Sequence, residues 1–86
     1  MNNNKRRNDI EISAEILKVA LHGAKKSHIV YRANLNFEVV KRYLKRLNES
    51  GLINLPSIGN RIFKTTPKGR EYIHRYENLN NYMKVQ

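Results

Sequence analysis

The hydrophobic residues in the first half of the chain recur with the period of an α-helix. Three stretches show this period and predict helices at about residues 9–22, 26–33 and 37–49. In each of them apolar positions repeat at intervals of three and four, so that one face can be buried. These positions are Ile10, Ile12, Ile16, Leu17, Val19, Ala20 and Leu21 in the first helix, Ile29, Val30 and Ala33 in the second, and Phe37, Val40, Leu44 and Leu47 in the third, with Tyr43 at its margin.

The breaks between the predicted helices contain typical capping residues. Gly23 and Gly51 are expected to end the first and third helices. The second and third helices are separated only by Asn34-Leu35-Asn36, which predicts a tight turn. In this turn Leu35 should point inward, and Asn36 should cap the third helix.

After residue 51 the pattern changes from helical spacing to alternation. Leu52–Leu55 and Arg61–Thr65 are predicted to be short strands joined by a turn-rich tip. Thr66-Pro67 then opens a last helix to about Lys84. We therefore expect a mostly helical α+β fold, a winged helix-turn-helix with three helices, a short β-hairpin wing and an extended C-terminal helix. The predicted organisation is a disordered basic arm at 1–8, the winged domain at 9–66 and a dimerisation helix at 67–86.

The distribution of charge points to a folded basic surface. The 86 residues carry 17 Lys and Arg against 7 Asp and Glu, a formal net charge of +10. Between Lys25 and Arg70 there are eleven basic residues and only two acids, Glu38 and Glu49. The excess is thus concentrated in the middle of the chain rather than in a tail. Such a surface favours a polyanionic partner.

Several classes of protein are disfavoured by what the chain lacks. The longest apolar runs are three residues, which argues against a membrane-spanning helix. There is no cysteine, and the histidines, His22, His28 and His74, are far apart and outside any catalytic or metal-binding motif. We therefore expect no enzymatic activity, no cofactor, no metal and no membrane association. The expected location is the cytoplasm, with the protein associated with the nucleoid.

The central sequence resembles a known family. Residues 25–53, KKSHIVYRANLNFEVVKRYLKRLNESGLI, and residues 63–73, FKTTPKGREYI, are similar to small archaeal winged-helix DNA-binding proteins. The resemblance extends from about Ile12 to Tyr82, and YRANLNF and TTPKGREY are its most specific parts. It implies DNA binding. It also implies that two chains pair through an antiparallel coiled coil of their extended fourth helices.

The predicted third helix has the geometry of a helix that reads DNA. Its apolar stripe lies opposite a polar face rich in Lys and Arg, and the first turns of such a helix lie against base edges in the major groove. Arg42 could pair with guanine, Glu38 with cytosine and Asn36 with adenine. The candidates for base reading are Asn36, Glu38, Val39 and Arg42. The candidates for contacts with the DNA backbone are Lys25, Lys26, Arg32, Lys41, Lys45, Arg46, Asn60, Arg61 and Lys64.

The last predicted helix carries an apolar seam. Tyr72, Tyr76, Leu79 and Met83 are spaced by four, three and four residues, as in a coiled coil. Tyr72 and its neighbour Ile73 are expected to cover the core of their own domain. The rest of the seam predicts a homodimer, and the alternative is a helix folded back on its own domain.

Three functions remain open at this point. We expect a homodimeric, sequence-selective transcriptional regulator that binds double-stranded DNA. One alternative is an architectural, chromatin-like protein that binds duplex DNA regardless of sequence, and another is a basic protein-interaction module. RNA binding is disfavoured because the aromatic strand motif and the GXXG loop of common RNA-binding domains are missing. The arm at Lys5-Arg6-Arg7 is either a minor-groove contact or a solubilising tail.

Overall fold

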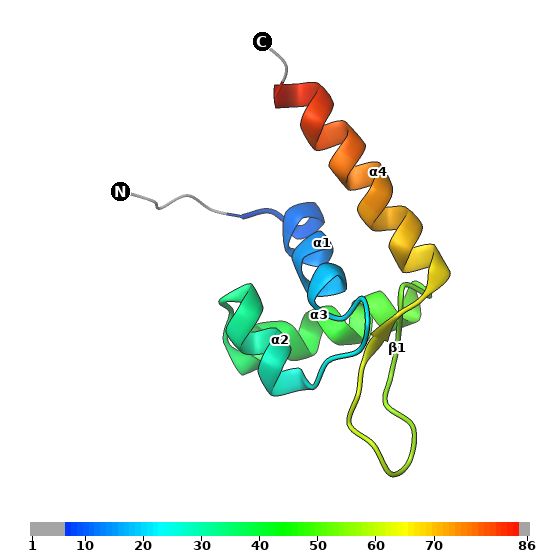
Figure 1. Cartoon of the computed structure of the whole chain (residues 1–86). Coiled ribbons are helices and arrows are strands. Elements are labelled where there is room, and N and C mark those ends of the chain that lie inside the picture. Colours follow the sequence, from blue (N-terminus) through cyan, green and yellow to red (C-terminus); the bar gives the residue numbers. More distant parts are fainter. Residues whose placement is uncertain (1–6, 85–86) are drawn as a thin grey trace.

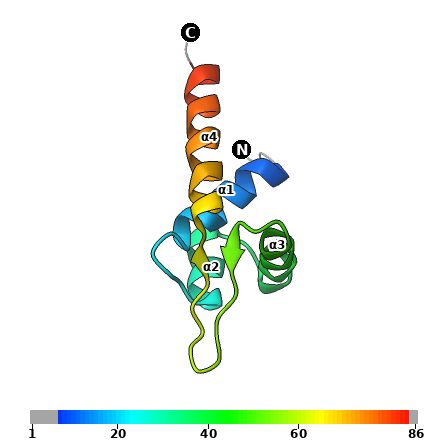
Figure 2. The ribbon, with the colours of Figure 1, turned by 90° about the vertical axis from the view of Figure 1, so that its right-hand side faces the viewer.

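A computed structural model describes residues 7–84 of the chain, and it confirms the predicted order of elements. Three helices surround the core, and the hairpin and the last helix project from it in opposite directions (Figures 1 and 2). The molecule is elongated as a result, with extents of 48 × 29 × 19 Å. The elements are α1 (Asp9–Val19), α2 (Lys26–Ala33), α3 (Phe37–Glu49), β1 (Ile53–Asn54), β2 (Lys64–Thr65) and α4 (Pro67–Lys84).

The core is formed by the apolar faces of the first three helices and the base of the hairpin. Its largest fully buried side chains are Ile16, Leu17, Ile29, Val40 and Ile53. Burial of an aliphatic side chain of this size stabilises the fold by about 1.5–3 kcal/mol. The apolar positions that repeat with helical spacing in the sequence therefore form the core, to which α1, α2, α3 and β1 each contribute.

Helix α1 ends earlier than predicted, at Val19 rather than near His22. The carbonyls at its end are used by the last strand: the Thr65 hydroxyl donates to the Leu17 carbonyl at 2.7 Å, and the Thr65 N–H donates to the Ala20 carbonyl at 3.0 Å. The chain then turns through Gly23, whose φ is 102°. Long-range pairing with the hairpin thus replaces the final turn that local periodicity predicted.

The turn between α2 and α3 matches the prediction. Asn34 adopts the left-handed conformation with φ 57°, and Leu35 packs partly buried against the core. The side chain of Asn36 accepts a hydrogen bond from the Val39 N–H at 2.8 Å, so the predicted N-cap is confirmed. These three residues therefore set the direction in which α3 starts after the turn.

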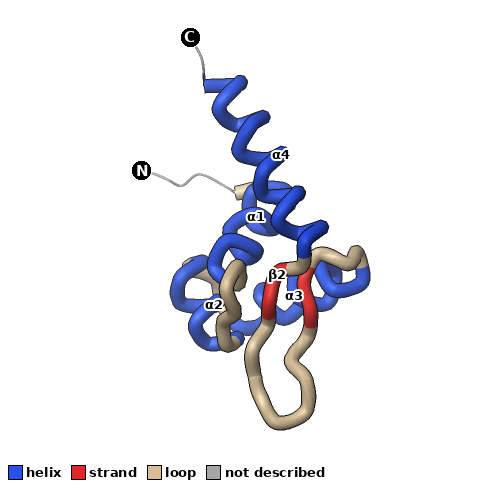
Figure 3. Tube along the Cα trace, turned by 45° about the vertical axis from the view of Figure 1, so that its right-hand side comes forward, coloured by secondary structure: helices blue, strands red, loops and turns tan. Residues whose placement is uncertain are grey.

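The hairpin strands are shorter than predicted (Figure 3). β1 and β2 contain two residues each and pair antiparallel, with Ile53 opposite Thr65. Phe63 instead pairs with Ala24, through N–H···O distances of 2.9 and 2.8 Å. The segment before α2 is therefore joined to the hairpin by an isolated antiparallel bridge beyond the two-stranded sheet, which sequence alternation did not reveal.

Helix α4 begins directly at the base of the hairpin. The Thr66 hydroxyl accepts from the Gly69 N–H at 3.0 Å and donates to the Gly51 carbonyl at 2.7 Å, so the predicted cap is confirmed. A Cβ atom on Gly69 would lie 2.2 Å from the Leu52 carbonyl oxygen. Only glycine permits this close approach of α4 to the hairpin.

Three apolar assignments need correction. Phe37 was expected in the core but is 54% exposed, whereas Leu35 of the preceding turn packs against the core. Ile10, in the first turn of α1, is also exposed. Tyr43 was expected at the margin of the core, yet only 6% of it is exposed. Tyr72 and Ile73 do pack against the core, as predicted.

Candidate nucleic-acid interface

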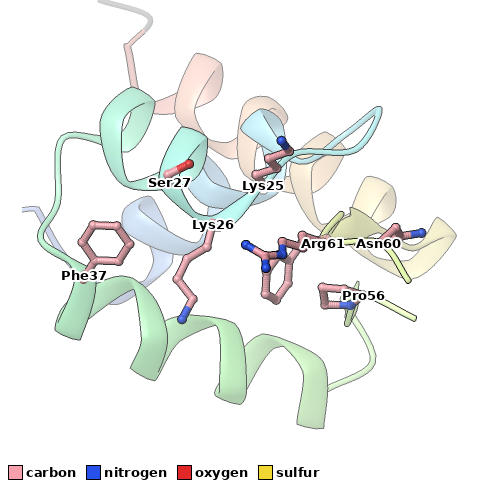
Figure 4. Close-up of a pocket in the computed structure, with 8 residues that line it drawn as sticks. Lys25, Lys26, Ser27, Phe37, Pro56, Asn60 and Arg61 are labelled. Carbon is pink, nitrogen blue, oxygen red and sulfur yellow. The ribbon is translucent and has the colours of Figure 1, made fainter. Parts of the chain in front are cut away.

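A cleft of about 410 Å³ opens between α2, α3 and the hairpin (Figure 4). The helix-turn-helix geometry brings the start of α2 beside the start of α3, and the hairpin closes the third side. Four of the residues predicted to contact the DNA backbone, Lys25, Lys26, Asn60 and Arg61, line this cleft although they come from different elements. The lining residues are Lys25, Lys26, Ser27, Phe37, Pro56, Asn60, Arg61 and Phe63.

A second cleft of about 240 Å³ continues the first along α3. Lys26, Lys41 and Lys45 line it, together with Leu55 at the base of the hairpin. At 100° per residue, Lys41 and Lys45 lie on the flank of α3 that faces α2 and the hairpin. The two clefts therefore form one basic surface along one side of the molecule.

The cations of this surface lack acidic partners within residues 7–84. The ion pairs of this part of the chain join Lys18 to Glu77, Arg46 to Asp9 and Arg75 to Glu71. None of these pairs includes a cation that lines the two clefts, so the positive charges of the clefts are available to an external anion. We call the following set the basic face: Lys25, Lys26, Lys41, Lys45 and Arg61, which line the two clefts, together with Arg42 and Lys64, which are exposed next to the lining residues Lys41 and Phe63 in the sequence.

The start of α2 adds backbone donors to the basic face. Lys25 occupies the N-cap position, but its side chain makes no capping hydrogen bond, and the first turn contains no acid. Unpaired N–H groups at a helix start favour a negative charge. A phosphate beside Lys25 and Lys26 would meet both kinds of donor.

The four predicted base-reading residues do not share one environment. Glu38 and Arg42 are exposed on the outward side of α3. The side-chain oxygen of Asn36 is occupied by the Val39 N–H, and Val39 is partly buried against the core. Glu38 and Arg42 are therefore the better placed of the four.

Arg46 faces the opposite flank of α3 from the clefts. Its guanidinium lies 3.3 Å from the Asp9 carboxylate and 5.2 Å from the centre of the Tyr43 ring. The Tyr43 hydroxyl also donates a hydrogen bond to Asp9. This bond is the larger cause, and the contact with Arg46 the second, of the lowered pKa of the Asp9 carboxyl. Burial of Tyr43 and its bond to Asp9 raise the pKa of the phenol. Arg46 thus has an internal partner that sequence reasoning missed, since the two residues lie 37 positions apart.

The remaining backbone candidates lie at the hairpin and at the end of α2. Lys64 is exposed in β2, and Arg61 is exposed just after the tip. The side chain of Asn60 accepts from the Ile62 N–H at 2.9 Å and so helps to shape the tip. Arg32 is exposed in the last turn of α2.

The predicted arm divides at residue 7. Lys5 and Arg6 lie outside the described residues, whereas the Arg7 guanidinium donates to the carbonyls of Ala33 and Asn34 at 2.9 and 3.1 Å. Arg7 therefore neutralises the carbonyl end of α2.

The seam of α4 divides into an internal and an open part. The Tyr72 hydroxyl donates to the Ile10 carbonyl at 2.9 Å. One turn further along, the Lys18 ammonium of α1 lies over the Tyr76 ring. The same ammonium pairs with Glu77 at 2.5 Å. These contacts attach the first half of α4 to α1. Beyond them, three apolar side chains remain 57%, 78% and 70% exposed on one face: Leu79, Tyr82 and Met83. Tyr82 was not among the predicted dimerisation residues, although it lies three residues after Leu79.

Two absences within residues 7–84 concern metal binding and membrane spanning. This part of the chain holds no group of three or more His, Asp or Glu side chains placed to bind a metal ion. In the same part, every helix is too short or too polar to cross a membrane.

Comparisons with known proteins agree with this architecture. The crystal structure of Sso10a-2, a DNA-binding protein from Sulfolobus solfataricus, is similar with a TM-score of 0.81 and 25% identity, covering 90% of this chain and 82% of that one. ZitR of Lactococcus lactis, a zinc-responsive MarR family member, shares the fold with a TM-score of 0.63 and 18% identity. That match covers 95% of this chain but 62% of ZitR. The curated proteins give no match.

A family model assigns the chain directly. The model describes a winged helix-turn-helix and matches residues 6–84, nearly the whole sequence. The structure contains each part of that fold: the helix-turn-helix of α2 and α3, the hairpin between β1 and β2, and the flanking helices. This chain is a member of the winged helix-turn-helix family.

Proposed function

We propose that the protein binds double-stranded DNA, with α3 in the major groove and the start of α2 and the hairpin on the flanking backbone. The observation that carries this proposal is the basic face, whose cations come from three elements and lack acidic partners among the described residues. A helix-turn-helix presents its second helix to base edges in the same way. The DNA-binding activity named for Sso10a-2 supports the proposal.

Within this arrangement the residues divide into two roles. Arg42 and Glu38 project outward from α3 and are the main candidates for base reading, with Asn36 and Val39 secondary because of their internal contacts. The backbone candidates are Lys25, Lys26, Arg32, Lys41, Lys45, Asn60, Arg61 and Lys64. Arg46 contributes through its pairing with Asp9, which orients α3 against α1.

We further propose that binding is sequence-selective and that the protein is a transcriptional regulator. Glu38 stands in the first turn of α3 among exposed cations. A carboxylate there repels phosphates, so it weakens uniform coating of DNA, but it can accept a hydrogen bond from cytosine. This feature favours a regulator over an architectural protein.

The open part of α4 supports a homodimer. Leu79, Tyr82 and Met83 expose an apolar stripe on a helix that extends beyond its own domain (Figure 1). Pairing with the same stripe of a second copy would bury it by two-fold symmetry. The dimer would present two α3 helices to two half-sites. The protein acts inside the cell, on this view, without a cofactor or catalysis.

A duplex titration at several salt concentrations tests the proposal. We expect tight binding at low salt and a linear fall of log K with log salt, with a slope of roughly −0.9 for each phosphate contact. A fragment surrounding the protein's own gene, compared with random duplex, measures selectivity. Equal affinity for both would favour the architectural alternative. Absence of binding at low salt would overturn DNA binding and favour the protein-interaction module.

A further inference from the structure

Phe37 is an exposed aromatic residue at the first position of α3. Its side chain is 54% exposed and lines the cleft between α2, α3 and the hairpin. Figure 4 shows the ring beside Lys26, with Arg61 and Pro56 across the cleft. Phe37 is thus the more exposed of the two aromatic rings of α3, and it lies in the cleft that Lys25, Lys26 and Arg61 also line.

The fold itself gives little reason for an aromatic ring at this position. Asn36 already caps α3, and Leu35 already packs beneath the turn. A single exposed apolar residue is common on protein surfaces. Here, however, Lys26 lies beside the ring, and Lys25 and Arg61 line the same cleft, so a polyanion bound by these cations would lie close to the ring.

We propose that Phe37 contacts the 5-methyl group of a thymine in the major groove. This inference rests on the proposed DNA binding and adds a specificity-determining residue to it. Residues at the start of a helix in the major groove approach base edges. The phenyl ring has no hydrogen-bonding group, and thymine presents a methyl group where cytosine has only a hydrogen. Phe37 would therefore select thymine at one position of the site.

The position of Phe37 makes this contact complementary to those of its neighbours. Glu38 follows it in the sequence, and Arg42 lies one helical turn further along. Those two side chains can read hydrogen-bonding groups, whereas Phe37 can read only shape and apolar surface. The three together would distinguish base pairs that hydrogen bonds alone leave similar.

The test compares two duplexes of the same sequence, one made with thymidine and one with deoxyuridine throughout. They differ only in the 5-methyl groups, so the comparison holds whichever site the protein prefers. We expect the wild-type protein to prefer the thymidine duplex by about fourfold for each methyl contact, which equals about 0.8 kcal/mol. Phe37→Ala should abolish this preference while the protein remains folded by circular dichroism.

Tyr31→Ala is the matched control. Tyr31 is an aromatic residue of α2 with 82% exposure, and it is absent from the residues that line the cleft. This variant should keep the wild-type preference for thymidine.

The outcomes separate this inference from the proposed function. Binding to both duplexes with equal affinity would overturn the methyl contact and leave DNA binding intact. A thymidine preference that survives Phe37→Ala would also overturn it, because another residue or the DNA itself would be responsible. Failure to bind either duplex at low salt would overturn the proposed function and this inference with it.

Discussion

The hydroxyl of Tyr43 donates a hydrogen bond to the carboxylate of Asp9, and this contact joins the middle of α3 to the first turn of α1. Arg46 reaches the same carboxylate from one turn further along α3. The flank of α3 away from the clefts is therefore held by polar contacts as well as by the core. This arrangement fixes the rotation of α3 about its axis and so determines which side chains reach the basic face.

The Asp9 contact should make stability dependent on acid pH. Its hydrogen bond from Tyr43 and its pairing with Arg46 lower the pKa of the carboxyl below the ordinary 3.8. The unfolded chain then binds the proton more readily, so the stabilisation is present above 3.8 and is lost as the pH falls through the folded value. Urea unfolding of Asp9→Asn should show a deficit relative to wild type at pH 7 that shrinks in acid.

Glu11→Gln is the control for this prediction. Glu11 lies in the same turn of α1 and forms no ion pair within residues 7–84. Its substitution should leave the acid dependence unchanged. A deficit of Asp9→Asn that stays constant from pH 7 to acid would show that the carboxylate contributes nothing through its charge.

Gly69→Ala should destabilise the fold despite its position in a helix. Alanine is ordinarily favoured over glycine in a helix by about 1 kcal/mol. Here the added Cβ would lie 2.2 Å from the Leu52 carbonyl oxygen and 2.5 Å from a methyl carbon of Thr65. Overpacking of this kind costs roughly 1–3 kcal/mol and should outweigh the gain. Chemical denaturation measures the difference, with exposed Arg70→Ala as the control; an unchanged or raised stability would contradict the contact.

Removal of Lys25 and Lys26 should flatten the salt dependence of DNA binding. Each phosphate contact that is lost should reduce the slope of log K against log salt by roughly 0.9, and affinity should fall alike for all sequences. Lys18→Ala removes one positive charge, from a lysine that is already paired with Glu77, and it should leave the slope unchanged. An unchanged slope in the Lys25→Ala, Lys26→Ala variant would place the start of α2 away from DNA.

Arg42→Ala should weaken binding selectively. If Arg42 pairs with a guanine, its loss should cost roughly 1–3 kcal/mol at the preferred site and relax one position of it. Lys41→Ala, at an exposed neighbour that is a candidate for contact with the DNA backbone, should affect the preferred and random duplexes equally. Competition binding against both duplexes measures this, and equal losses for Arg42→Ala would identify a phosphate contact instead.

The open stripe of α4 predicts how the proposed dimer would respond to substitution. Truncation of a large buried side chain costs roughly 2–5 kcal/mol, so Leu79→Ala with Met83→Ala should shift the protein toward monomer while sparing the domain fold. DNA affinity should fall in parallel. Sedimentation velocity at micromolar concentration tests this, with exposed Asn81→Ala as the control. A monomeric wild-type protein would show that the stripe serves another purpose.

Much of the fold could be predicted from the sequence because its main signals are local. The period of apolar residues, Asn36 as a cap and Thr66-Pro67 as a helix start all act within one or two turns. The predictions failed where distant residues compete for the same groups. Helix α1 ends before its predicted last turn, where the Leu17 carbonyl accepts a hydrogen bond from the Thr65 hydroxyl. Phe63 pairs with Ala24 rather than with a residue across the hairpin.

The candidate site shows the same division. The charge pattern identified the lysines and arginines of the basic face, because net charge and helical face are readable from spacing. It did not reveal that Arg46 pairs with Asp9 or that Phe37 is exposed in the cleft, since both depend on how the helices pack. The split of the α4 seam at Tyr76 also depends on a tertiary contact, with Lys18 of α1.

The direct passage from the hairpin into α4 has a mechanical consequence. Gly69 lies against the Leu52 carbonyl, and Thr66 bonds to Gly51, so no flexible linker separates the 18-residue helix from the strands. A helix of that length extends about 27 Å. In a dimer joined at the far ends of these helices, the rigid α4 helices would set the distance between the two hairpins. Tension or twist in the bound duplex would then pass along α4 to the second domain instead of being absorbed between them.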